Sequence, residues 1–256
     1  MRQFHDAVQL AGMDGGRYVI SPMTEADIVP LASIYRKVWI RRDMALCVLD
    51  AGEQLNFKKT GGMFRIQDAK SLAHLLFDPS EFVWVVREGG QPLGAFWCGL
   101  TDKKYQNLSC ILPQDGCEAL PRHIESGQSE GTLYFSKEII IDPDRRGRGL
   151  SEALINTAMR FFHTRGFQQS CGEVYYVHTM TDSTGEHTVG LLNEASFRML
   201  SRTGCRLEGA FPPCIVHADG FDALISMQIV RWDLNPSLKV ANETLQAAGI
   251  MMEKYA

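Results

Sequence analysis

The sequence lacks several features that would place it in a secreted or membrane class. Its seven cysteines are scattered without a Cys-x-x-Cys pair, and the nearest two are Cys110 and Cys117. No basic start followed by an apolar run opens the chain, and no apolar run approaches the length of a membrane span. We therefore expect reduced thiols in a cytoplasmic protein without a transmembrane helix.

Basic charge and clustered metal ligands are also scarce. The formal net charge is -4 and the isoelectric point is about 6.0, whereas nucleic-acid binding requires a basic face. His and Cys do not recur at the spacing of a metal site. We expect no metal and neither nucleic acid nor membrane as a partner, and we leave a homodimer open.

The 256 residues are enough for one large domain, and 45% of them are hydrophobic. Apolar periodicity predicts strands and helices that alternate after an early hairpin, which indicates one mixed α/β sheet. The expected strands are 17–21, 82–88, 91–100, 133–141, 172–180, 205–211 and 221–232, and the expected helices are 24–39, 68–78, 150–166, 191–204 and one in the tail.

Three polar segments are harder to assign. Residues 102–131 predict an insertion or a long loop with one short helix near 118–124, and a functional lid and plain disorder are both open. Residues 181–188, which include His187, predict a loop before the helix expected at 191–204. Residues 217–220 predict a turn.

The segment IIIDPDRRGRGLSEALINTAMRFF joins an apolar strand to an amphipathic helix. Pro143 helps to end the strand, and Gly147 and Gly149 allow backbone amides to turn inward. The helix begins near residue 150 with its unpaired amides and positive dipole end toward this loop, while Arg146 and Arg148 add charge. Together these features suit a phosphate or pyrophosphate site, and a plain basic surface turn stays open as the alternative, since neither a Walker loop nor a dinucleotide fingerprint is present.

Residues 143–150 resemble the pyrophosphate loop of the GNAT superfamily of N-acyltransferases. Arg146, Gly149 and Ser151 match the pattern Arg/Gln-x-x-Gly-x-Gly/Ala, with Ser151 as a departure at the last position. The resemblance extends over residues 17–234 through RYVISPMTEADI, VVREGGQPLGAFWCG and LLNEASFRMLSRTGC. It divides the chain into an extension at 1–16, a domain at 17–234 with insertions near 45–80 and 102–131, and a helical tail at 235–256.

The resemblance implies a fold and a donor. The fold is a mixed, mostly antiparallel α/β (α+β) sheet with two splayed central parallel strands and helices on both faces. The donor is acetyl-CoA, whose pantetheine arm would pair with the backbone of one splayed strand while Asn193 contacts its end or the acceptor side. The implied backbone and loop contacts are Ile139, Ile140, Ile141, Arg146, Gly147, Arg148, Gly149, Leu150 and Ser151.

Amine acetylation also requires two proton transfers. Glu138 and His178 are our candidates for the base, although each has an alternative role, as part of an ion pair and as a hydrogen-bonded strand histidine respectively. The resemblance places the family's usual acid, a tyrosine, at Leu200, which cannot donate a proton. Ser196 is the candidate acid, and Tyr175 and Tyr176 are others that could instead pack as strand aromatics.

The preferred hypothesis is an N-acetyltransferase that moves an acetyl group from acetyl-CoA to a primary amine of a small molecule by direct attack in a ternary complex. Two alternatives stay open. One is a non-catalytic module that binds acyl-CoA, suggested by Leu200. The other is an acyltransferase that uses a longer acyl-CoA or an acyl-carrier protein, suggested by the two insertions.

Overall fold

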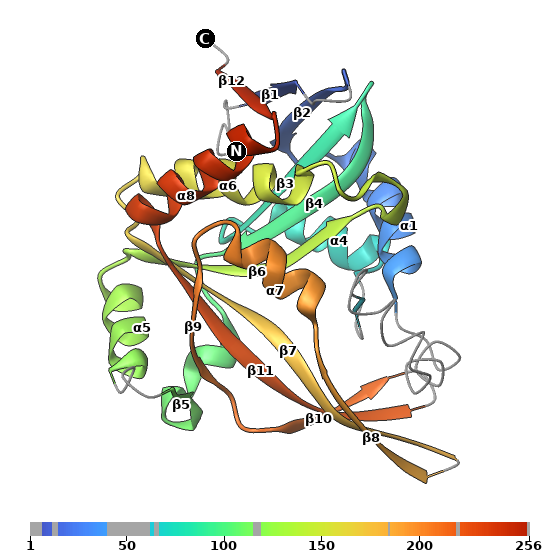
Figure 1. The fold of residues 1–256 in the computed structure, drawn as a ribbon, viewed down its shortest axis with the longest axis vertical. Coiled ribbons are helices and arrows are strands. Elements are labelled where there is room, and N and C mark those ends of the chain that lie inside the picture. The colour runs from blue at the N-terminus through green and yellow to red at the C-terminus, as the bar shows by residue number, and fades with distance from the viewer. Residues whose placement is uncertain are drawn as a thin grey trace.

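The computed structural model describes residues 7–11, 15–39, 62–63, 67–114, 119–183, 185–218 and 221–254. Within them, twelve strands form one sheet in the order β12-β1-β2-β3-β4-β6-β7-β11-β9-β5, with β8 on β7 and β10 on β11 (Figure 1). Of the named strand pairs only β6 and β7 run parallel. The strands are β1 (Val8–Ala11), β2 (Arg17–Pro22), β3 (Glu81–Glu88), β4 (Gln91–Gly99), β5 (Leu112–Pro113), β6 (Leu133–Ile141), β7 (Gln169–Asp182), β8 (Gly185–Leu192), β9 (Arg206–Ala210), β10 (Cys214–Ala218), β11 (Phe221–Asp233) and β12 (Met251–Lys254).

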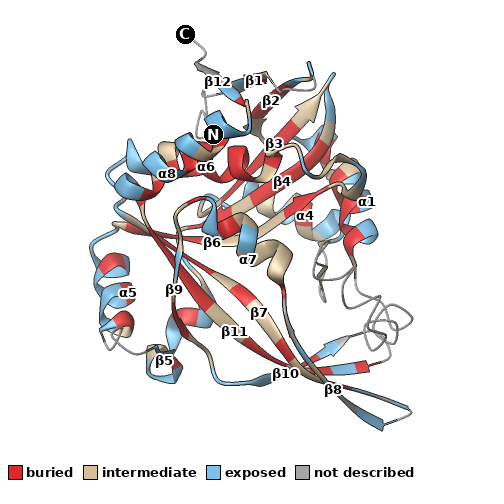
Figure 2. Ribbon diagram, viewed as in Figure 1, coloured by how far each residue is buried: buried red, intermediate tan, exposed pale blue. Residues whose placement is uncertain are grey.

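Helices cover both faces of this sheet, as the resemblance implied. Leu154 and Phe162 of α6 and Leu245 of α8 join one core, whereas Leu31 of α1 and Leu72 of α4 join the core on the opposite face. Figure 2 shows the buried residues along the central strands and on the inner sides of these helices. The α-helices are α1 (Ile28–Val38), α4 (Ala69–Phe77), α5 (Leu120–Ser129), α6 (Leu150–His163), α7 (Glu194–Ser201) and α8 (Leu234–Ala247). No helix in the described part of the chain has the length and apolar character needed to cross a membrane.

Local sequence signals correctly marked several boundaries. The β3–β4 hairpin turns at Gly89 and Gly90, whose φ values are 55° and 85°, because glycine adopts this left-handed region without steric cost. Thr24 and Asp27 form the capping box that precedes α1, and Asp68 caps α4.

One of the expected loops is part of the sheet. Residues 181–188 were expected to be a loop, but the described ones belong to β7 and β8, because each of these strands supplies backbone partners to the other. The expected turn at 217–220 begins inside β10, and β10 pairs antiparallel with β11 with Ala218 opposite Phe221, which agrees with a turn between the two strands. The side chain of His187 lies outside the described residues.

The segment 102–131 is largely built of short elements. It contains the 3-10 turns Lys103–Gln106 and Leu108–Cys110, strand β5 paired with β9, and α5, which ends five residues later than the helix expected near 118–124. Both ends of the chain join the sheet, since β1 lies between β2 and β12. The tail helix is confirmed as α8, and β12 follows it.

Candidate active site and cofactor cleft

The two parallel strands separate after four residue pairs. Only Leu133–Ser136 of β6 pair with β7, where their partners are Gln169–Gly172. Beyond this point β6 continues beside β4 to Ile141, whereas β7 continues beside β11, and Figure 1 shows the two strands diverging. The second half of β6 therefore has no strand partner on its β7 side among the named strands, and the expected splay is confirmed.

A cleft of about 570 Å³ opens beside this gap. Its walls come from the second half of β6, the loop that follows, the first turn of α6, the inner side of α7 and the end of α8. The lining residues include all nine that the resemblance assigned to the backbone and loop contacts, Ile139, Ile140, Ile141, Arg146, Gly147, Arg148, Gly149, Leu150 and Ser151. Asn193 does not line it.

The loop between β6 and α6 has a left-handed backbone at both glycines. The φ values are 78° at Gly147 and 69° at Gly149, and the first helical bond runs from the amide of Ala153 to the carbonyl of Gly149. The amides of the first turn of α6 consequently have no partner within the helix and can bind an anion. The Arg146 side chain donates to the carbonyl of Ile141, over 3.4 Å.

The charge of the cleft suits a polyphosphate. Among the described residues, the lining contains five arginines and one carboxylate, that of Glu152. Burial lowers the pKa of the Arg146 guanidinium, so a bound anion would offset the loss of hydration there. These observations fit the pyrophosphate that the loop sequence predicted.

Glu138 lies on β6 opposite Trp97, on the face covered by α1. Its carboxylate accepts hydrogen bonds from the Tyr35 hydroxyl at 2.8 Å and from the Gln67 amide at 3.0 Å. Burial raises the pKa of Glu138, and the two hydrogen bonds counteract this shift only in part. Glu138 is therefore a buried carboxylate with increased proton affinity and two hydrogen-bonded neighbours, and it does not line the cleft.

The β7 residues near the gap have their own partners. Glu173 accepts a hydrogen bond from Lys104 over 2.6 Å, and burial raises the pKa of Glu173. The Tyr175 hydroxyl donates to the carbonyl of Gly62. His178 lies at a bulge opposite β11, with its Nε2 3.0 Å from the hydroxyl of Ser226, and it does not line the cleft.

The sequence comparison decides the family. Residues 49–187, more than half of the chain, match the model of the Acetyltransferase (GNAT) family. The chain belongs to this family. No match was found among curated proteins.

Solved structures agree with this GNAT fold. Mycobacterium smegmatis RimJ in complex with CoA-disulfide is similar over 95% of this chain and 93% of its own, with 14% identity and a TM-score of 0.52. An N-acetyltransferase from Staphylococcus aureus Mu50 is similar over 85% of this chain and 99% of its own, with 14% identity and a TM-score of 0.50. At this identity the likeness shows the fold alone.

In this GNAT chain α7 spans Glu194–Ser201 and is shorter than the helix expected at 191–204. Asn193 is buried and caps the helix by accepting a hydrogen bond from the amide of Ser196 at 3.3 Å. Ser196 lines the cleft. Leu200, at the position of the family's usual acid, is buried in the main core. Its apolar side chain therefore packs among other apolar side chains.

Sequence reasoning missed several residues that the GNAT fold brings to the site. Tyr35 and Gln67 reach Glu138 from far away in the chain, and nothing in their local sequence indicates it. Arg198 and Arg202 stand four residues apart on one face of α7, a spacing that could have suggested a second basic wall. Thr244, at the end of α8, lines the cleft through a contact that only the fold creates.

Proposed function

We propose that this protein is an N-acetyltransferase that transfers the acetyl group of acetyl-CoA to a primary amine of a small molecule, by direct attack in a ternary complex. The main support is the gap between β6 and β7, which opens into a cleft that ends at an arginine-rich loop. The complex of RimJ, a protein of the same fold, contains CoA-disulfide and agrees with this choice of donor.

The residues of the chain fit such a donor. Backbone amides of 147–151 and the Arg146 guanidinium would hold the pyrophosphate. The second half of β6 would pair its outward backbone groups with the amides of the pantetheine arm. The donor supplies an activated thioester, and the protein contributes chiefly by fixing the amine beside its carbonyl carbon.

Glu138 would accept the proton that the attacking ammonium loses, directly or through a water. Its fixed position between Tyr35 and Gln67 and its raised pKa support this role. His178, whose Nε2 lies 3.0 Å from the Ser226 hydroxyl, is the second candidate, and neither it nor Glu138 lines the cleft. For the departing thiolate, Ser196 is our candidate acid because it lines the cleft where Leu200 offers no hydroxyl.

Calorimetric titration with CoA tests the donor, and release of free thiol from acetyl-CoA in the presence of an amine panel tests the reaction. We expect CoA binding together with amine-dependent thiol release. Glu138→Gln should abolish most of this release and retain CoA binding. Failure to bind millimolar CoA would refute the donor assignment.

A second candidate is a module that binds acyl-CoA without catalysis. The buried Leu200 favours it, because the hydroxyl used by relatives is replaced by a core side chain. This candidate predicts tight CoA binding and no thiol release with any amine. A third possibility is a transferase that uses a longer acyl chain. Thiol release measured with a panel of acyl-CoA donors and with acylated carrier protein separates it from the acetyltransferase and from the non-catalytic module.

A further inference from the structure

Two buried carboxylates stand where β6 and β7 separate. The last pair of these strands is Ser136 with Gly172, and Glu173 is the next residue of β7. Glu138, the proposed base, lies two residues beyond Ser136 on β6. Burial raises the pKa of both carboxylates, and the ammonium of Lys104 opposes this rise at each of them. Lys104 therefore lies close to both Glu138 and Glu173.

The Glu173 carboxylate binds an ammonium group through only one of its oxygens. Its Oε2 accepts a hydrogen bond from Nζ of Lys104 over 2.6 Å, and the Lys104 side chain is 48% exposed, so it can turn away into solvent. Oε1 of Glu173 is buried and has no hydrogen-bond partner in the described part of the chain. A buried carboxylate oxygen without a partner costs free energy, so Oε1 can accept a hydrogen bond from a ligand.

A second polar group without a partner belongs to Tyr105. This side chain is 2% exposed, and its ring packs on Phe135 with the centroids 4.7 Å apart. Among the described residues its hydroxyl has no hydrogen-bond partner. Burial, and after it the charge of Glu173, raises the pKa of the Tyr105 hydroxyl, which is therefore protonated and close to the carboxylate. A hydroxyl oxygen and a carboxylate oxygen can both accept hydrogen bonds from one ammonium group.

The charges around Glu173 favour a cation. Asp102 adds a further negative charge beside it. Lys137, which acts on Glu138, is already paired with a carboxylate of β3 over 2.6 Å. Among the described groups that act on these carboxylates, the ammonium of Lys104 therefore stands against three negative charges, those of Glu138, Glu173 and Asp102.

The cleft beside the β6–β7 gap extends toward this side of the sheet. Val38 and Met63 line the cleft and also belong to the core beneath α1. Tyr175, two residues after Glu173 and so on the same face of β7, donates to the carbonyl of Gly62, which lines the cleft as well. An acceptor that reaches the gap from the α1 side would therefore pass Glu173.

We propose that Glu173 and the Tyr105 hydroxyl bind a second ammonium group of the acceptor, so that the acceptor is a diamine whose other amino group is acetylated near Glu138. Lys104 occupies Glu173 in the absence of the acceptor and is displaced by it. The inference rests on the proposed function, because it names the class of the acceptor amine. The second ammonium group takes no part in the transfer of the acetyl group.

Paired measurements with diamines and monoamines of equal length, from three to six carbons, test this site. The readouts are thiol release from acetyl-CoA and calorimetric binding of each amine to the protein. At one or more of these lengths the wild type should use and bind the diamine about tenfold better, the size of one hydrogen bond to a charged group. Glu173→Gln should lose this preference and keep its activity with monoamines within about twofold.

Tyr105→Phe separates recognition from a purely structural role. Because the hydroxyl has no partner among the described residues, its removal should not lower the unfolding temperature, whereas binding of the diamine should weaken several-fold. Glu125→Gln, at an exposed position on α5, is the matched control and should change neither readout. Thermal unfolding of Glu173→Gln verifies that this variant is folded.

Equal use and binding of diamines and monoamines by the wild type at every length would overturn the diamine site and leave the proposed function intact. So would an equal loss of both kinds of amine in Glu173→Gln. Binding of a diamine that depends on Glu173, without thiol release from acetyl-CoA, would support the site and overturn the proposed acetyl transfer.

Discussion

At the scale of single residues, the proposed base depends on neighbours that come from elsewhere in the chain. Tyr35 on α1 and Gln67 before α4 both donate to the Glu138 carboxylate. Burial raises the pKa of Glu138, and these donors lower it by stabilising the charged form. The strand supplies the carboxylate, and its neighbours set the pH at which it can accept a proton.

Tyr35→Phe should move the acidic limb of the pH–rate profile to higher pH. A base acts when ionised, and loss of the hydroxyl leaves the carboxyl pKa higher than in the wild type, which itself lies above the usual 4.5. Measuring amine-dependent thiol release between pH 5 and 9 checks this, with CoA affinity as the control. An unmoved limb would exclude Glu138 as the titrating group.

Gly147→Ala and Gly149→Ala form a matched pair in the loop. Both residues have positive φ, which costs a non-glycine residue about 1 kcal/mol. A Cβ at Gly147 meets nothing within 4 Å, whereas one at Gly149 would lie 2.2 Å from Cδ1 of Ile250. We expect Gly149→Ala to lower the free energy of unfolding and CoA affinity more than Gly147→Ala, by urea denaturation and titration. Equal effects would mean that Ile250 simply moves aside.

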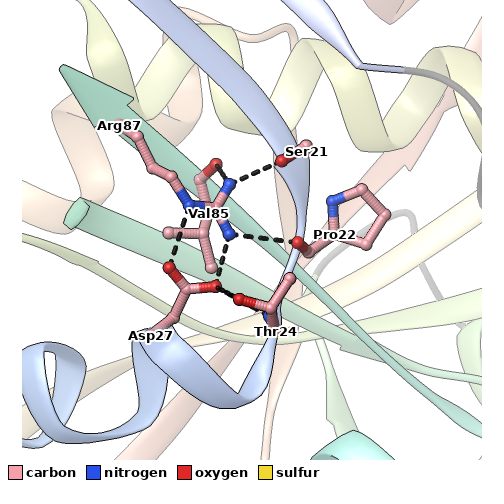
Figure 3. A network of polar contacts seen from close by, with 6 residues as sticks. All are labelled: Ser21, Pro22, Thr24, Asp27, Val85 and Arg87. Atoms are coloured by element: carbon pink, nitrogen blue, oxygen red, sulfur yellow. Dashed lines mark hydrogen bonds and ion pairs between the residues drawn. The ribbon is translucent and has the colours of Figure 1, made fainter. Parts of the chain in front are cut away.

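At the scale of elements, α1 is tied at its start to β3 and near its end to the residue that follows β6. At its start, Arg87 on β3 binds the buried carboxylate of Asp27 and donates to the hydroxyl of Ser21 (Figure 3). At its end, Lys37 pairs with Asp142, just after β6, over 2.7 Å. These contacts fix the position of α1, and α1 carries the Tyr35 hydroxyl that donates to Glu138.

Asp27→Asn should cost about 3 kcal/mol of unfolding free energy at pH 7, because it leaves the Arg87 guanidinium buried without its counter-charge. Burial alone would raise the pKa of Asp27, but the hydrogen bonds from Arg87 and Thr24 outweigh it and lower the pKa below 3.8. The native state therefore binds this proton less readily than the unfolded state, and the stabilisation is lost as pH falls through the lowered pKa.

Urea denaturation of the wild type and of Asp27→Asn at pH 7 and near pH 3 checks this prediction. The difference in unfolding free energy should shrink at the lower pH. Lys70→Gln, at an exposed position on α4, is a suitable control because it should be neutral at both values. A difference that does not depend on pH would show that the amide preserves the hydrogen bonds.

At the scale of the whole molecule, the two ends of the chain are built into the sheet and the cleft. β12 pairs with β1, and Ile250, just before β12, joins the main core and packs on Gly149. The end of α8 lines the cleft beside β6. The C-terminal residues, which we expected as a tail, therefore contact the proposed phosphate loop directly.

Ile250→Ala should lower the unfolding free energy by about 2 to 4 kcal/mol, as for other truncations of buried aliphatic side chains. It should also weaken CoA binding, because the loop loses its packing at Gly149. We expect calorimetry to show a single unfolding transition at lower temperature. Val240→Ala, at a partly exposed position on α8, should have a smaller effect. Two separate transitions would show that the C-terminal elements form an independent unit.

The sequence by itself determined the parts of this protein that depend on neighbouring residues. The β3–β4 hairpin, the cap of α4 and the glycine-arginine loop all follow from the local backbone preferences of the residues that form them. The loop also carried the resemblance to the GNAT family, and the splayed sheet was expected from that resemblance.

Only the tertiary structure decided which distant side chains meet. It placed Tyr35 on Glu138, Thr244 beside Arg202, and Ile250 on Gly149, and it extended β7 and β8 through residues expected to form a loop. These outcomes depend on burial and on backbone partners supplied from remote parts of the chain. The local propensities of the residues do not encode these contacts, because the contacts stabilise the protein only once the sheet has brought the residues together.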